Sequence, residues 1–157
     1  MHHIRVDTPI GELLLVADEE GITYVAFAEE NQAIHTAGST PGDTPILTQA
    51  RTQLAEYFSQ QRQQFDVPLS WPGSGEAGFR GKAQRLLQTI PYGEIRTYKQ
   101  LAIELGSPGA VRAVGSACAT NPLPIFVPCH RITRSDGSLG GYRGGLEAKQ
   151  WLLKLET

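Results

Sequence analysis

The sequence has few cysteines and no long apolar segment. Only two of its 157 residues are cysteines, Cys118 and Cys129, which excludes a disulfide framework and fits a reducing compartment. Apolar runs are short, as at residues 13–17, whereas a membrane span needs roughly 20 apolar residues. The first residues also lack the apolar stretch of a signal peptide. These absences predict a cytoplasmic protein with no membrane partner.

Basic residues are scarce in the first part of the chain and abundant in the second. Residues 1–70 carry a formal charge of −7, whereas residues 71–157 carry +5. Such an asymmetry favours a polyanion as the partner of the C-terminal part. On charge alone, a chance scatter of surface residues explains the asymmetry slightly better than a polyanionic partner does. The charge therefore does not decide whether the protein binds a polyanion. The segment 72–75, Pro-Gly-Ser-Gly, lies where the charge changes sign and is the expected linker between domains at residues 1–72 and 76–157.

The first 70 residues have the pattern of a small α+β lobe. The expected strands are residues 3–7, 12–17 and 22–28. Tight glycine-containing connections between these segments predict an antiparallel meander. Residues 31–45 contain two glycines and two prolines, so we expect a loop there. Apolar residues recur at helical spacing over residues 46–60, and residues 65–71 fit one more strand.

The second part of the chain is mainly helical in pattern. Helices are expected at residues 79–90, 98–105 and 108–119. Thr97 is the expected N-cap of the second helix, and Ser107 with Pro108 forms the expected N-cap and first turn of the third. Two helices joined by a short turn match a helix-turn-helix in outline. The small residues of the third helix fit a close approach to a partner, or simply the crossing of two helices.

Residues 128–131, Pro-Cys-His-Arg, hold the strongest candidate for chemistry. Three prolines within residues 121–128 exclude a helix and predict a rigid, partly extended segment. A cysteine on such a backbone is well placed to act as a nucleophile once its pKa is lowered by a histidine, a base relay or a helix N-terminus. Core packing explains a single Cys-His pair as well, so the tetrapeptide alone leaves both interpretations open.

Motifs along the second half of the chain stand in the order and spacing of one protein family. They are Ile-Pro-Tyr-Gly at 90–93, Tyr98, Ala-Val-Arg-Ala-Val-Gly at 110–115, Asn-Pro at 121–122, Pro-Cys-His-Arg at 128–131, Gly-Tyr-Arg-Gly-Gly at 141–145 and Lys-Gln-Trp-Leu-Leu at 149–153. On these residues the sequence resembles the O6-alkylguanine-DNA alkyltransferases, also called methylated-DNA–protein-cysteine methyltransferases. The resemblance is close over residues 79–156 and looser over residues 1–70. It implies an α+β protein with a strand-rich first lobe and a helical, DNA-binding second lobe.

The resemblance implies a DNA repair protein that acts once. Members of the family flip O6-alkylguanine, and in some cases O4-alkylthymine, out of duplex DNA and move the alkyl group irreversibly onto their own cysteine. Matched by position, Cys129 is the acceptor, His130 removes its proton through a bound water, and Glu156 orients His130. Tyr98 matches the tyrosine that donates a proton or hydrogen bond to the leaving guanine. No cofactor is implied.

The resemblance also implies how duplex DNA is held. Arg112 matches the arginine that enters the duplex where the flipped base had been. The helix that carries it is expected in the minor groove, where the small Ala113, Gly115 and Ser116 permit a close approach. Asn121 matches the asparagine that fixes the turn between this helix and the acceptor cysteine.

Several positions depart from the family pattern. Tyr142 matches a tyrosine that holds the flipped base, but Arg143 stands where small residues are common, and it is expected to narrow the pocket or contact phosphate. Cys118 is expected to pack at the pocket rim, with oxidation against Cys129 as an alternative. Gln84 lies in a helix that usually carries Val-Trp there, so we expect a differently packed core.

No metal is expected, and three other protein classes compete with the repair protein. Some relatives bind zinc through cysteines of the first lobe, but none precedes Cys118 here, and His2, His3 and His35 are expected to be solvated. An alkyltransferase-like binding protein would lack the acceptor Cys129. A cysteine hydrolase would need an oxyanion hole, and a transcription factor would need more base-reading side chains than an Ala- and Gly-rich helix offers. We expect a monomer.

Overall fold

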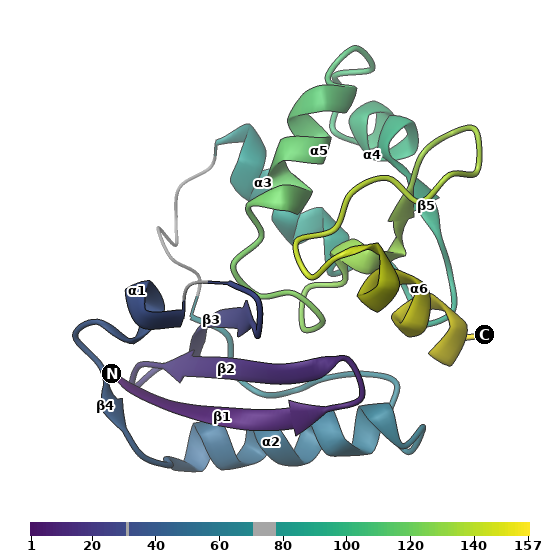
Figure 1. The fold of residues 1–157 in the computed structure, drawn as a ribbon. Helices are drawn as coiled ribbons and strands as arrows, with labels where there is room; N and C mark the ends of the chain where they lie inside the picture. Colours follow the sequence, from purple (N-terminus) through teal and green to yellow (C-terminus); the bar gives the residue numbers. More distant parts are fainter. Residues whose placement is uncertain (31, 71–77) are drawn as a thin grey trace. The chain divides into compact units, whose positions relative to one another are not determined.

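The computed structural model describes residues 1–30, 32–70 and 78–157. The chain divides into two compact units, Met1–Ser74 and Gly75–Thr157 (Figure 1). The first contains a sheet with helices and the second is mainly helical, so the predicted α+β class is confirmed. The expected linker, residues 72–75, lies outside the described residues.

The first unit is built on the antiparallel meander that the sequence predicts. Its strands are β1 (His2–Thr8), β2 (Gly11–Ala17) and β3 (Ile22–Phe27). β2 is the central strand and pairs with both neighbours, and residues 13–17 are all buried. Leu14 and Val16 pack with Ala26 beneath Tyr24, on one face of the sheet. Burial of successive side chains on opposite faces explains why this apolar run is continuous.

Helix α2 (Pro45–Phe58) confirms the helix expected near residues 46–60. Thr44 caps it by accepting a hydrogen bond from the Leu47 amide at 3.2 Å, and Pro45 occupies the first turn, where a missing N–H costs nothing. Leu47, Leu54 and Tyr57 have no exposed surface. The helix lies along the sheet of its own unit and contacts all three long strands (Figure 1).

Part of the loop expected at residues 31–45 forms regular secondary structure, so the prediction of a loop is wrong there. It holds a short helix, α1 (Gln32–Thr36), and a two-residue strand, β4 (Thr40–Pro41), which pairs in parallel with β1. Proline is tolerated in β4 because β4 is an edge strand. The strand expected at residues 65–71 is reduced to one bridge between Ile22 and Leu69, and residue 71 lies outside the described residues.

The second unit packs two helices against a third. α3 (Phe79–Leu87) and α4 (Tyr98–Glu104) both contact α5 (Val111–Ala119). α4 begins where it was predicted, and Thr97 forms a full capping box with Gln100. α3 ends three residues before the predicted position, at Leu87. The amides that follow bond to carbonyls three residues back, and Pro91 cannot continue a helix.

The prediction for the start of α5 is wrong. The helix begins at Val111, with Ala110 at the N-cap, and not at Pro108. The Ser107 carbonyl instead accepts a hydrogen bond from the Ala110 amide at 2.9 Å, which closes a turn before the helix. Gln84 of α3 is buried, and its side-chain amide donates to the Ala117 carbonyl of α5 at 3.1 Å. That this core is packed differently from those of relatives stays a prediction.

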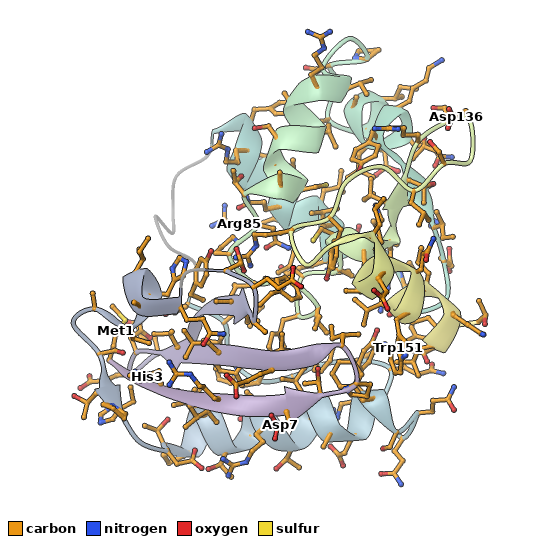
Figure 2. The ribbon with its side chains drawn as sticks, in the orientation of Figure 1. Met1, His3, Asp7, Arg85, Asp136 and Trp151 are labelled. Carbon is orange, nitrogen blue, oxygen red and sulfur yellow. The ribbon has the colours of Figure 1, made fainter. Side chains whose placement is uncertain are left out.

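A two-stranded parallel pairing positions the residues around Cys129. β5 (Arg96–Thr97) pairs with β6 (Ile132–Thr133). β5 leads directly into α4, and β6 directly follows the single 3-10 turn η1 (Cys129–Arg131). The pairing therefore holds the start of α4 beside the end of the Cys129 turn. The chain then runs through a loop, which contains Asp136, to the last helix, α6 (Leu146–Leu155) (Figure 2).

Candidate active site

A cavity of about 550 Å³ in the second unit gathers many of the predicted site residues. Six of them line it: Tyr98 from α4, Arg112 and Gly115 from α5, Cys129 from η1, and Tyr142 and Arg143 from the loop before α6. Its volume lies within the range of small-molecule sites and is sufficient for a nucleobase. The structure therefore brings together residues that are up to 45 positions apart in the sequence.

The loop before Cys129 is held rigidly. The Asn121 side chain donates to the Val127 carbonyl at 2.9 Å and accepts from the Leu123 amide at 3.0 Å. The Val127 amide in turn donates to the Leu123 carbonyl at 2.8 Å. Within this loop Ile125 is buried at φ +75°, a conformation that a β-branched residue rarely adopts. Such strain persists only where surrounding contacts determine the backbone, which fixes the position of Cys129.

Cys129 is a buried thiol in the lining of the cavity, with 4% of its surface exposed, and Cys118 lines the same cavity. Burial raises the pKa of Cys129, while the Asn121 amide and the positive charges of Arg143 and Lys149 act in the opposite direction. The thiol form is therefore favoured at neutral pH. A reaction at this sulfur needs a group that removes the proton.

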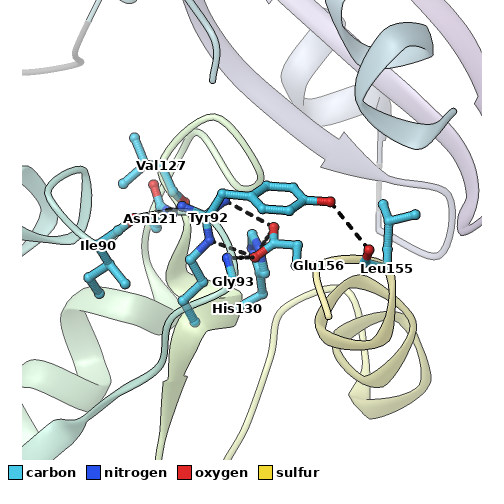
Figure 3. A network of polar contacts seen from close by, with 9 residues as sticks. Ile90, Tyr92, Gly93, Asn121, Val127, His130, Leu155 and Glu156 are labelled. Atoms are coloured by element: carbon cyan, nitrogen blue, oxygen red, sulfur yellow. Dashed lines mark hydrogen bonds and ion pairs between the residues drawn. The ribbon is translucent and has the colours of Figure 1, made fainter. Parts of the chain in front are cut away.

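His130, the residue after Cys129, forms a buried pair with Glu156 (Figure 3). His130 Nε2 lies 2.7 Å from Glu156 Oε2, and neither side chain is exposed by more than 1%. Burial lowers the pKa of His130, and the bond to Glu156 opposes this shift. Because a carboxylate only accepts hydrogen bonds, the neutral imidazole carries its proton on Nε2. Nδ1 is then left with its lone pair.

His130 Nδ1 is buried and has no hydrogen-bond partner among the described residues. Buried nitrogen atoms almost always have a partner, so an isolated lone pair at this depth requires an explanation. A proton acceptor that works through one water molecule would have this arrangement. The contact between His130 and Glu156 is present, and their role in removing the Cys129 proton stays a prediction.

Arg131 is a member of this network that the sequence analysis missed. Its guanidinium donates to Glu156 Oε1 at 2.8 Å and to Oε2 at 3.0 Å, and also to the Ile90 carbonyl at 2.6 Å. The Gly93 amide adds a longer contact to Glu156 Oε1 at 3.5 Å, and the Tyr92 hydroxyl donates to the Leu155 carbonyl at 3.2 Å (Figure 3). These contacts fix the end of α6. The signal was present in the sequence, since Arg131 belongs to the Pro-Cys-His-Arg motif.

Tyr98 keeps its proton at neutral pH. Burial, followed by the nearby thiols, raises the pKa of Tyr98 to about 12. The Gly140 backbone lies close to the Tyr98 hydroxyl. A Cβ atom at residue 140 would lie only 2.7 Å from the hydroxyl oxygen, so a side chain there would collide with Tyr98. Gly140 also has a φ of +73°, a second reason for glycine there. Tyr98 is therefore a hydrogen-bond donor held in one place.

Lys149 is the second charged residue that the sequence analysis left without a role. It is fully buried on α6, and its ammonium donates to the Leu139 carbonyl and, at 3.3 Å, to the Gly141 carbonyl. The same ammonium lies 5.9 Å from the centre of the Tyr98 ring. Lys149 thereby fastens the loop that presses on Tyr98.

Other predicted residues lie outside the cavity. Asn121, His130 and Glu156 are buried behind it, whereas Ala113 and Ser116 are exposed on α5. The opposite face of α5 is buried, so the exposed face is the one that can meet a partner.

No cluster of metal-binding side chains occurs among the described residues. The prediction that His3 is solvated is wrong, because His3 is 5% exposed on β1 and bonds to the Ser39 hydroxyl (Figure 2). His35 stacks on Tyr24 with ring centres 3.9 Å apart. In the described parts of the chain, we find no helix with the length and apolar character needed to cross a membrane.

Together, the cavity, the buried thiol and the His130–Glu156 pair define a cysteine-based group-transfer site in a two-part α+β protein. Residues 1–71 match the model of the 6-O-methylguanine DNA methyltransferase ribonuclease-like domain, and residues 78–157 match that of the 6-O-methylguanine DNA methyltransferase DNA binding domain. The chain belongs to the 6-O-methylguanine DNA methyltransferase family.

Relatives of known name support this assignment over nearly the whole chain. The chain is 41% identical to a methylated-DNA–protein-cysteine methyltransferase of Methanosarcina acetivorans, covering 99% of this chain and 98% of the relative. It is 42% identical to the constitutive enzyme of Bacillus subtilis, covering 99% and 94%. Among solved structures, Mycobacterium tuberculosis OGT in complex with DNA matches with a TM-score of 0.89 and 39% identity, covering 99% of this chain and 92% of that one.

Proposed function

We propose that this protein repairs O6-alkylguanine, and also O4-alkylthymine, in duplex DNA by transferring the alkyl group irreversibly to Cys129. The observation that carries the proposal is the buried Cys129 thiol in the lining of a base-sized cavity, next in sequence to His130, which Glu156 holds at 2.7 Å. Cys118, a second buried thiol, also lines the cavity. Each molecule acts once, because the thioether that forms is not cleaved. A protein that acts on chromosomal DNA is expected in the cytoplasm, and we include this location in the proposal.

The first chemical step is removal of the thiol proton of Cys129. His130 Nδ1 accepts it through a water molecule, and the Glu156 carboxylate stabilises the imidazolium that results. Arg131 holds the carboxylate in place with two hydrogen bonds. The Cys129 thiolate then attacks the alkyl carbon, and the bond from that carbon to guanine O6 breaks.

The second requirement is a donor for the leaving guanine. Negative charge develops on the base as the bond to the alkyl group breaks, and a fixed donor stabilises that charge most. Tyr98 lines the cavity and keeps its proton, because burial raises its pKa to about 12. Tyr142 lines the same cavity and would hold the flipped base.

DNA binding is assigned to the exposed face of α5. Arg112 lies at the start of this helix and lines the cavity, so it is placed to fill the gap left by the flipped base. Ala113, Gly115 and Ser116 keep the helix slim enough for the minor groove. The helix-turn-helix formed by α4 and α5 remains part of this proposal.

Intact mass spectrometry with a duplex that contains O6-methylguanine tests the function. One methyl group per protein, mapped to Cys129, is expected, and repair should stop at one equivalent when DNA is in excess. Cys129→Ser should abolish transfer and keep DNA binding, whereas Cys118→Ser should keep most activity. Continued turnover, or a methyl group on Cys118, would contradict the assignment.

A further inference from the structure

The cavity that holds Cys129 is lined by cations and, among the described residues, by no carboxylate. Arg112, Arg134 and Arg143 all line it, and the buried ammonium of Lys149 lies behind its wall. We propose that Arg143 makes the site select O6-alkylguanines whose alkyl group ends in a carboxylate, such as carboxymethyl, over neutral groups of the same size. This inference rests on the proposed function and names a substrate class for it.

Arg143 is the arginine best placed for this role. It is half-buried, whereas Arg112 and Arg134 are exposed. It lines the same cavity as Cys129, and its positive charge acts to lower the pKa of that thiol.

Transfer of a carboxymethyl group brings two anions together. Cys129 gives up its thiol proton, its Sγ forms a bond to the CH2 carbon, and the bond from that carbon to guanine O6 breaks. The electron pair stays with guanine, which takes up one proton. The products are S-carboxymethyl Cys129 and unmodified guanine.

The carboxylate lies one bond from the carbon that the thiolate attacks, so the two negative charges repel each other within a few ångströms. A guanidinium beside both charges offsets that repulsion and can hold the carboxylate with paired hydrogen bonds. A neutral group gains neither effect. Discrimination by Arg143 therefore depends on charge and not on size.

The test compares two lesions of equal size. Two duplexes of one sequence carry either O6-carboxymethylguanine or O6-carboxamidomethylguanine, in which a neutral amide replaces the carboxylate. The measured quantity is the ratio of the two single-turnover rate constants, followed by intact mass spectrometry. Because both lesions share the DNA contacts and the thiol chemistry, a change of this ratio between variants isolates the interaction with the carboxylate.

The ratio of carboxymethyl to carboxamidomethyl transfer should fall about tenfold in Arg143→Ser and change less than threefold in Arg143→Lys, which keeps the charge. Arg134→Ser, which removes an exposed arginine of the same cavity, is the matched control and should also change the ratio less than threefold. An unchanged ratio in Arg143→Ser, or an equal fall in Arg134→Ser, would overturn the inference.

Two further measurements keep the test decisive. If Arg143→Ser does not fold by thermal melting, the salt dependence of the unaltered protein replaces it. Its ratio should fall as ionic strength rises, because an open cavity is reached by screening ions, and a salt-independent ratio overturns the inference. An O6-methylguanine duplex is run in parallel. Absence of methyl transfer refutes the proposed function itself, whereas methyl transfer with an unchanged ratio refutes only the role of Arg143.

Discussion

Arg131→Met should destabilise the protein strongly and in a pH-dependent way. The Arg131 side chain is 8% exposed and gives Glu156 two hydrogen bonds, at 2.8 and 3.0 Å. Methionine fills a similar volume but leaves the Glu156 carboxylate buried without its cation. Loss of one partner of a buried ion pair costs roughly 3–5 kcal/mol. Total stabilities are about 5–15 kcal/mol, so the effect should be easy to measure.

The pH dependence follows from His130. In the unaltered protein the charge of Arg131 helps to lower the pKa of His130. Without Arg131 the pKa of His130 rises, because Glu156 still favours the imidazolium. A raised pKa in the folded state adds stability at low pH, and this stability is lost as pH increases. The deficit of Arg131→Met should therefore be larger at pH 8 than at pH 6.

Urea unfolding at pH 6, 7 and 8 measures this deficit for both proteins. The double variant Arg131→Met/Glu156→Leu is the control, because removing both charges should recover a good part of the loss. A deficit below about 1 kcal/mol, or one that does not change with pH, would refute the reasoning that Arg131 neutralises Glu156.

Three other changes should have distinct effects. Arg112→Ala should lower repair of methylated duplex about tenfold or more, equal to about 1.4 kcal/mol, and leave reaction with free O6-alkylguanine nearly unchanged, as competition kinetics would show. Gly140→Ala should slow transfer because its methyl group would collide with the Tyr98 hydroxyl, and loss of thermal stability without slower transfer would contradict this. Burial lowers the pKa of His130, so the folded state resists protonation of this side chain. As the pH decreases from about 6.5, the unfolding free energy should therefore decrease by up to about 1.4 kcal/mol per pH unit. The decrease should be less steep in His130→Gln.

Much of the fold was predictable because local signals agreed with the tertiary structure. The strands β1 to β3 and the helix α2 follow from apolar spacing, and the start of α4 follows from the capping residue Thr97. The predictions failed where the contact is remote in sequence. β4 exists only because residues 40–41 find the edge of β1, and nothing within residues 31–45 encodes that pairing.

The candidate site was predictable in its residues but not in its support. The quoted motifs contain eight of the twelve residues that line the cavity. Arg131 and Lys149 were left without roles although they are charged and lie within the motifs. Patterns of polarity place Arg and Lys at the surface. Here both are buried, because Arg131 is 6% exposed and Lys149 is 0% exposed. A charged residue within an otherwise apolar helix face was the available signal for Lys149.

The two buried cations solve different electrostatic problems. Arg131 meets the Glu156 carboxylate, so the charge behind His130 is balanced before any reaction. The Lys149 ammonium donates to two carbonyl oxygens. Burial lowers the pKa of Lys149, and the negative charge of an ionised Cys129 opposes that shift. Positive charge near Cys129 is therefore in place before the thiolate exists, and ionisation of the thiol neutralises it. Burial favours the protonated form of Cys129, while the positive charges of Arg143 and Lys149 reduce the cost of forming the thiolate. Under the proposed mechanism, this reduction assists transfer of the thiol proton to His130.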